Sequence, residues 1–298
     1  MRDTAASLKQ ARAAEQAAGD LPALLVAAER LAQAIMLGQH GRRRAGPGDA
    51  FWQFRPYGFG DSTQRIDWRR SAKASRLFIR ENEWEAANTL WLWVSASPRM
   101  DYASPLARET KRSRALLLAL AMGFLALEGH ERVGLLAGEP PVLARAGLPR
   151  LAAELLAATP EPLPPRARLS RASALVIAAD FLDPLTAIEA ALTPLAAQGV
   201  KGHLVQVTDP AEETLPFSGR TEFLGLDTPQ RLLAGRAEAL RAAYVEKFAA
   251  QRDGVQTIAR RLGFTFTVHH TDRAPAATLL ALHALIGQRL PPQAGGVA

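Results

Sequence analysis

Hydrophobic residues in the second part of this chain follow two alternating patterns. Short apolar runs, typical of buried strands, are separated by longer segments whose apolar residues recur every three or four positions, as on one face of a helix. The expected strands are TLWLWVS (89–95), RVGLLAG (132–138), PVLARA (141–146), SALVIAADF (173–181), GHLVQVTD (202–209) and FTFTVHH (264–270). This alternation predicts an α/β fold, a mainly parallel sheet with helices on both faces, as in Rossmann-like proteins.

The first 88 residues are organised differently. Apolar residues spaced by three and four predict an amphipathic helix that starts near Asp20 and Pro22 and ends at Gly38. FWQFRPY (51–57) and RLFIRENEWE (76–85) have partly alternating strand patterns, and a capping-box spacing between Asp61 and Gln64 predicts a helical turn between them. We therefore expect an N-terminal helical segment (1–40), a β-rich module (41–88) and an α/β domain (89–298).

The positive charge of the chain is concentrated in the β-rich module. The net charge is +7, and the segment from Arg42 to Arg80 has ten Arg or Lys against three Asp, a difference of seven. Such a segment can bind nucleic acid, anionic lipid or an acidic protein surface, or its arginines can pair internally. Trp52, Tyr57 and Trp68 are interleaved with these arginines, as on nucleic-acid surfaces.

The acidic residues of this module favour internal pairing. Asp61 and Asp67 alternate with the arginines and would repel phosphate, so an internal network with Arg65 and Arg70 is preferred to a nucleic-acid surface. The residues without acidic neighbours, and hence the candidates for binding an acidic partner, are Arg42, Arg43 and Arg44.

Composition excludes several classes of site. The chain has no cysteine, so disulfides, thiolate metal sites and cysteine nucleophiles are excluded. The N-terminus carries charges throughout, unlike a signal peptide, and the longest apolar run (115–127) is shorter than the roughly 20 residues of a transmembrane helix. We expect a cytoplasmic protein without a membrane span.

Polar residues follow the expected strands, at the carboxyl edge where α/β sheets bind ligands. They are Ser95, Ser97, Arg99, Asp101, Asp180, Asp183, Thr208, Asp209, His269, His270 and Asp272. Asp183 is also the expected N-cap of the helix that follows it. His269 and His270 are adjacent on a strand and point to opposite faces, so we do not expect both to bind one ion. Ser95 and Ser97 lack the G-x-S-x-G elbow of serine hydrolases.

The segment GDAFWQFRPYGFGDSTQRIDWRRSAKASRLFIRENEWE (48–85) resembles the signature of the bacterial family named domain of unknown function fifty-eight. The motif positions are Arg55, Tyr57, Gly60, Asp61, Arg65, Asp67 and Trp68, followed by Ser71, Ala72, Leu77, Arg80 and Glu81. Agreement continues at RVGLL, ADFLDP and VTDPAEE. The resemblance implies a von Willebrand factor A-like fold, no enzymatic activity, and a role as partner or adaptor of a MoxR-type AAA+ ATPase in the assembly or maturation of other proteins.

Von Willebrand A domains carry a metal-ion-dependent adhesion site, and this chain matches it poorly. Ser95 stands at the position of the motif's aspartate, Ser97 at its first serine and Arg99 at its second, while Asp180 matches a later aspartate. Magnesium, the cation such a site would take, requires carboxylate oxygens, so we expect no metal or other cofactor here. Our hypothesis is that Arg99 replaces the cation and pairs with Asp180, Asp101 or an acidic partner residue; alternatively, Arg99 points to solvent.

Two functions follow from these features. The first is a protein-interaction module with a degenerate adhesion site, whose candidate partner-binding residues are Arg42, Arg43, Arg44, Arg99 and Asp101. The alternative is a nucleic-acid-binding or hydrolytic protein that uses the basic module and the carboxylates at the strand ends.

Overall fold

The computed structural model describes residues 2–39, 51–57, 68–73, 76–82, 89–170 and 173–286. The chain forms two compact units. Residues 1–39 and 88–298 make up the larger unit, and residues 40–87 make up the smaller. Within the described ranges, no helix is both long and apolar enough to cross a lipid bilayer.

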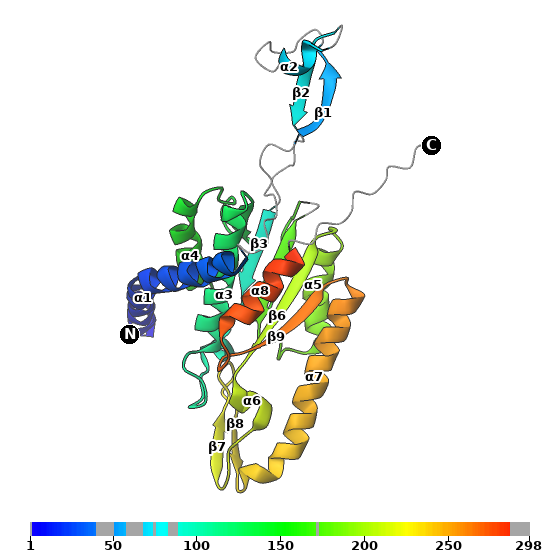
Figure 1. Cartoon of the computed structure of the whole chain (residues 1–298). Helices are drawn as coiled ribbons and strands as arrows, with labels where there is room; N and C mark the ends of the chain where they lie inside the picture. The colour runs from blue at the N-terminus through cyan, green and yellow to red at the C-terminus, as the bar shows by residue number, and fades with distance from the viewer. Residues whose placement is uncertain are drawn as a thin grey trace. The chain divides into compact units, whose positions relative to one another are not determined.

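A five-stranded parallel sheet is the centre of the larger unit (Figure 1). Its strands, in chain order, are β3 (Thr89–Val94), β4 (Arg132–Leu135), β5 (Ala174–Ala179), β6 (Lys201–Thr208) and β9 (Thr265–His270). In space the order is β4-β3-β5-β6-β9, so the order reverses beside β3. The strand expected over residues 141–146 is reduced to one antiparallel bridge between Val142 and Val133.

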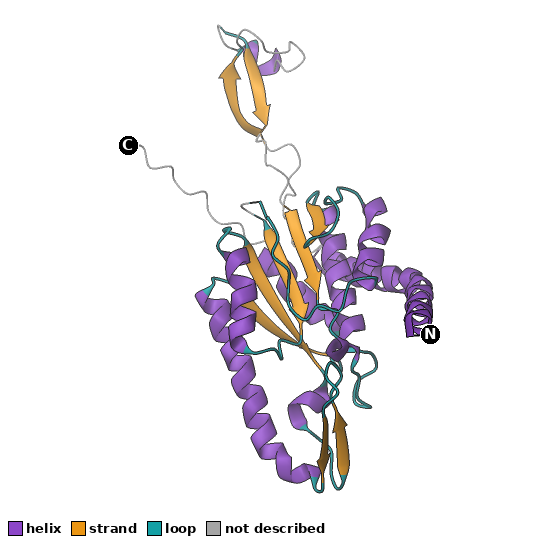
Figure 2. Ribbon diagram, turned by 180° about the vertical axis from the view of Figure 1, so that it is seen from behind, coloured by secondary structure: helices purple, strands orange, loops and turns teal. Residues whose placement is uncertain are grey.

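Helices cover both faces of the sheet, which confirms the predicted α/β fold class (Figures 1 and 2). The helices on one face are α1 (Arg2–Gln39), α3 (Lys111–Glu128), α4 (Leu148–Leu156) and α8 (Pro275–Ile286); those on the other are α5 (Leu185–Ala196) and α7 (Arg241–Arg261). Side chains of one strand alternate between the two cores: Leu92 packs with the first group and Trp93 with the second. Because both faces of the central strands are buried, β3 and β5 consist almost entirely of apolar residues.

Helix α1 is longer than its apolar pattern predicts. It begins at Arg2 rather than near Asp20, and Pro22 lies inside it. The preceding sequence is rich in alanine, the strongest helix former, and this propensity explains why the helix extends beyond its amphipathic part. Ala28, Ala32 and Ile35 are buried in the core shared with α3 and α4, so this part of α1 packs on the sheet domain.

Short elements surround the carboxyl ends of the strands. They are the 3₁₀ helix η2 (Pro98–Asp101), the helix α6 (Pro210–Thr214), the hairpin of β7 (Thr221–Leu224) and β8 (Arg231–Ala234), and the 3₁₀ helix η4 (Ala237–Leu240); a further 3₁₀ helix, η3 (Arg145–Gly147), precedes α4. The hairpin was not predicted, because its strands are four residues long and its leucines are exposed: Leu224, Leu232 and Leu233 are each more than half exposed.

The smaller unit contains β1 (Phe51–Pro56) and β2 (Phe78–Asn82), paired antiparallel, and the one-turn helix α2 (Trp68–Ser71) between them in sequence. The buried Ser71 Oγ accepts a hydrogen bond of 2.8 Å from the main-chain N–H of Phe78, which fixes the end of α2 on β2. Several predicted residues lie outside the described ranges: Arg42, Arg43, Arg44, Gly60, Asp61, Gln64, Arg65 and Asp67.

Candidate functional site

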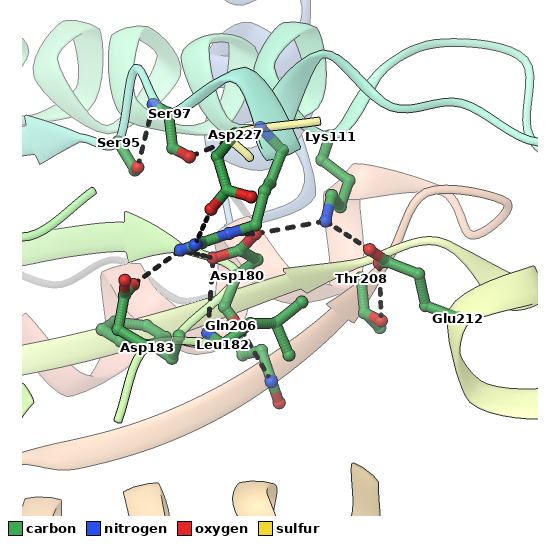
Figure 3. Close-up of polar contacts among 12 residues, drawn as sticks. Ser95, Ser97, Lys111, Asp180, Leu182, Asp183, Gln206, Thr208, Glu212 and Asp227 are labelled. Carbon is green, nitrogen blue, oxygen red and sulfur yellow. Dashed lines mark hydrogen bonds and ion pairs between the residues drawn. The ribbon is translucent and has the colours of Figure 1, made fainter. Parts of the chain in front are cut away.

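The turn after β3 is held by its own serines. Both Ser95 and Ser97 are buried. Ser95 Oγ donates to the carbonyl oxygen of Glu161 (3.3 Å) and accepts from the main-chain N–H of Ser97 (3.3 Å), while Ser97 Oγ caps η2 by accepting from the N–H of Arg99 (3.4 Å; Figure 3). The two hydroxyl groups therefore bind main-chain groups, and they fix the backbone from which Arg99 extends.

The guanidinium group of Arg99 binds three carboxylates. Its Nε lies 3.2 Å from Oδ2 of Asp180, its Nη2 lies 2.6 Å from Oδ2 of Asp183, and its Nη1 lies 2.5 Å from Oδ2 of Asp227. Asp180 and Asp183 follow β5, and Asp227 lies in the turn between β7 and β8. Burial lowers the pKa of Arg99, but the charges of Asp180 and Asp183 and their hydrogen bonds outweigh burial and raise it, so the group stays charged.

Of the two alternatives for Arg99, pairing with an acidic residue or pointing to solvent, the structure has the first. The side chain does not point to solvent, since only 17% of it is exposed. It pairs with Asp180, one of the anticipated partners. Asp101 is instead 58% exposed, and its carboxylate lies 4.0 Å from Arg112.

Asp183 does not cap α5 as predicted. The N-cap position belongs to Pro184, and no side chain makes a capping hydrogen bond there. The Asp183 carboxylate instead accepts a hydrogen bond from Nη2 of Arg99, at 2.6 Å.

A second cation, Lys111, lies beside Asp180. Its side chain is completely buried at the start of α3, and its Nζ lies 3.4 Å from Asp180 Oδ2 and 2.5 Å from Glu212 Oε1 (Figure 3). Glu212 also accepts from the N–H of Asp209 (2.9 Å) in the capping box of α6. Burial raises the pKa of Glu212, while Lys111 acts to lower it. Lys111 could not be predicted as a site residue, because a lysine at the start of a helix is usually solvated.

We refer to the linked side chains as the ionic cluster: Arg99, Lys111, Asp180, Asp183, Glu212 and Asp227. It contains two cationic and four acidic groups. Asp180 is only 2% exposed, and one of its oxygens, Oδ2, faces both cations. A divalent ion requires those oxygens and would lie against two fixed positive charges, so the donor set does not fit magnesium. Among the described residues, no group of three or more metal-binding side chains could hold a metal ion.

A family model described as protein of unknown function DUF58 matches residues 53–254, about two thirds of the chain. The chain belongs to the DUF58 family. All six residues of the ionic cluster lie within the matched range. Two mycobacterial relatives, the uncharacterized proteins Mb1516 of Mycobacterium bovis and Rv1480 of Mycobacterium tuberculosis, are each 26% identical over 259 residues, which cover 80% of this chain and 80% of each relative.

Two solved structures are similar to this DUF58 protein at low identity. One is an aerotolerance-related membrane protein from Bacteroides fragilis, at 14% identity and a TM-score of 0.38, and the other is BatB from Bacteroides thetaiotaomicron, at 12% and 0.31. Each comparison covers 68% of this chain and 100% of the other.

The histidines at the end of β9 have separate partners in this DUF58 protein. His269 Nε2 lies 3.1 Å from Nη1 of Arg114, and its Nδ1 lies 2.8 Å from Oγ1 of Thr278. Arginine can only donate, so Nε2 accepts and His269 is neutral. Burial, and then the charge of Arg114, lowers its pKa to about 4. His270 Nε2 lies 2.6 Å from Oε2 of Glu213.

Other polar residues at the strand ends hold the local structure. Asp209 accepts from the N–H groups of Ser104 and Ala211, both at 2.8 Å, and so joins the loop after η2 to α6. Thr208 Oγ1 lies 3.4 Å from Glu212 Oε2, and Asp272 pairs with its neighbour Arg273 at 3.8 Å.

Proposed function

We propose that this protein is a non-enzymatic, cytoplasmic interaction module, a partner or adaptor of a MoxR-type AAA+ ATPase in the assembly or maturation of other proteins. The ATPase is proposed from the family resemblance. The ionic cluster is proposed as the surface that contacts it. The observation that carries the proposal is the position of Arg99 and Lys111 against Asp180, at the carboxyl edge beside the reversal in strand order.

The cluster fits a contact surface better than a catalytic centre. The hydroxyl groups of Ser95 and Ser97 bind main-chain atoms rather than a base that could activate them. The three carboxylates that bind Arg99 hold its side chain in one position, so the site does not need a metal ion to stay ordered. Asp183 and Asp227 stay partly exposed around Arg99, at 13% and 32%, and present charge at the surface.

The test uses a purified MoxR-type ATPase from the same organism. The full chain is expected to bind the ATPase in size-exclusion chromatography and to change its rate of ATP hydrolysis. Asp183→Ala should weaken binding, while Asp272→Ala, a carboxylate at the end of β9 outside the cluster, should leave it unchanged. If the two wild-type proteins neither co-elute nor affect ATP hydrolysis, the proposed function is wrong.

Calorimetric titration with magnesium and manganese tests whether Arg99 takes the place of the metal ion of an adhesion site. We expect no tight binding by the isolated protein. Tight binding that is abolished by Asp180→Ala would show that the cluster still holds a metal. Salt-sensitive retention on DNA or RNA, without binding to the ATPase, would support the nucleic-acid alternative instead.

A further inference from the structure

The smaller unit presents an exposed tryptophan on a fixed turn. Trp68 is 66% exposed at the start of α2, and Leu77, just before β2, is 43% exposed. The turn that carries Trp68 is held by the hydrogen bond between Ser71 and Phe78. The Arg70 guanidinium lies over the Phe78 ring, with 5.7 Å between its Cζ and the ring centre. Tryptophan is one of the residue types enriched at protein–protein interfaces, so an exposed tryptophan on an ordered turn is a candidate contact residue.

Several cationic residues lie close to Trp68 in the sequence. The segment from Trp68 to Phe78 contains Arg69, Arg70, Lys73 and Arg76 and no acidic residue. Arg69, Lys73 and Arg76 are exposed. None of these three makes an ion pair within the part of the chain that the structure describes, in contrast to the arginine and lysine of the ionic cluster. Within the described residues, Arg69, Lys73 and Arg76 therefore present positive charge that no ion pair neutralises.

We propose that Trp68, Arg69, Lys73 and Arg76 form the contact surface for an acidic patch on the ATPase, with Trp68 in an apolar pocket of that partner. This inference rests on the proposed function and adds a second contact surface to that of the ionic cluster. Tryptophan and arginine are the residue types most enriched where protein interfaces lose the most affinity on truncation. Unpaired cations provide the charge complementarity that guides such an encounter.

The flanking acids favour a protein over a phosphate-rich surface. Asp67 directly precedes Trp68, and Glu81, Glu83 and Glu85 follow within the same unit. Carboxylates at these positions would be repelled by the continuous negative charge of nucleic acid or of an anionic membrane. A protein surface can place a basic or neutral group opposite each of them.

The experiment measures binding of the full chain to the purified ATPase for four proteins. They are the wild type, Trp68→Ala, the triple variant R69E/K73E/R76E, and the matched control R220E/R236E/K247E, which makes the same charge change at three exposed cations of the larger unit. We expect the dissociation constant to rise at least about tenfold for Trp68→Ala and about a hundredfold for the first triple variant. The control should stay within about threefold, and wild-type binding should weaken as salt rises.

The outcomes separate this inference from the proposed function. If the wild type does not bind the ATPase, the proposed function fails. If all four proteins bind it equally, only the surface assignment fails. Binding of vesicles of phosphatidylcholine and phosphatidylglycerol, or of oligo-dT, that the R69E/K73E/R76E variant loses while it still binds the ATPase would overturn the assignment in favour of lipid or nucleic acid. A changed thermal stability or hydrodynamic radius of that variant alone would show that the chain itself, or a second copy, covers the surface.

Discussion

The ammonium group of Lys111 lies 3.4 Å from the carboxylate of Asp180, and both side chains are buried, at 0% and 2% exposure. A buried charge is tolerated only when it is paired and hydrogen-bonded, and Lys111 meets this condition through Asp180 and Glu212. Removal of Lys111 would leave the Glu212 carboxylate without the cation it pairs with, and Asp180 with Arg99 alone. The stability of the carboxyl edge of the sheet therefore depends on this group.

Lys111→Met is expected to lower the free energy of unfolding by about 3–5 kcal/mol, because Asp180 and Glu212 would lose a buried cation. Chemical denaturation measures the change. Lys247→Met, at an exposed position of α7, is the control and should stay within about 0.5 kcal/mol of the wild type. The double variant K111M/E212Q should recover part of the loss; equal stability of Lys111→Met and the wild type would contradict the pairing.

Arg99→Lys is expected to cost about 1–3 kcal/mol, although the charge is conserved. A lysine ammonium cannot present the planar fork of donors that contacts Asp180, Asp183 and Asp227. Arg273→Lys, at a side chain that is 78% exposed, provides the matched control. The interpretation of Arg99 as a three-sided anchor is wrong if the two variants unfold at the same denaturant concentration.

Asp227→Asn is expected to loosen the β7–β8 turn without a large loss of global stability. The Asp227 carboxylate is 32% exposed, so its bond to Arg99 contributes at most about 1 kcal/mol. Hydrogen exchange of the amides at 225–230 should become faster, while those of β5 and β6 stay protected. Unchanged exchange in the turn would mean that the hairpin is held by other contacts.

Because the pKa of His269 is lowered, we expect the protein to lose stability in mild acid. Its folded pKa is about 4, below its ordinary value of 6.5, so between these values the unfolded state binds more protons. The contribution of His269 is complete above about pH 6.5 and is lost as the pH falls toward about 4, by about 1–3 kcal/mol. Unfolding free energies measured between about pH 7.5 and about pH 4.5 should fall less steeply for His269→Gln than for the wild type. Identical slopes would show that burial and the charge of Arg114 do not hold His269 neutral.

The apolar runs predicted the five strands of the sheet well, because strands covered on both faces are rich in apolar residues. The hairpin and the full length of α1 could not be predicted in this way. Four-residue strands give too short a period to recognise, and the first turns of α1 follow from alanine content rather than from an apolar face.

The sequence by itself determined the α/β fold, the family, and the position of Arg99 and Asp180 at strand ends, since these depend on local patterns and motifs. Only the tertiary structure decided which charges meet. Asp227 lies 128 residues from Arg99 in the chain, and Glu212 lies 101 residues from Lys111. Ion pairs form through space, and burial sets their strength, so no local pattern distinguishes Asp227, Glu212 or Lys111 from the solvated charges around them.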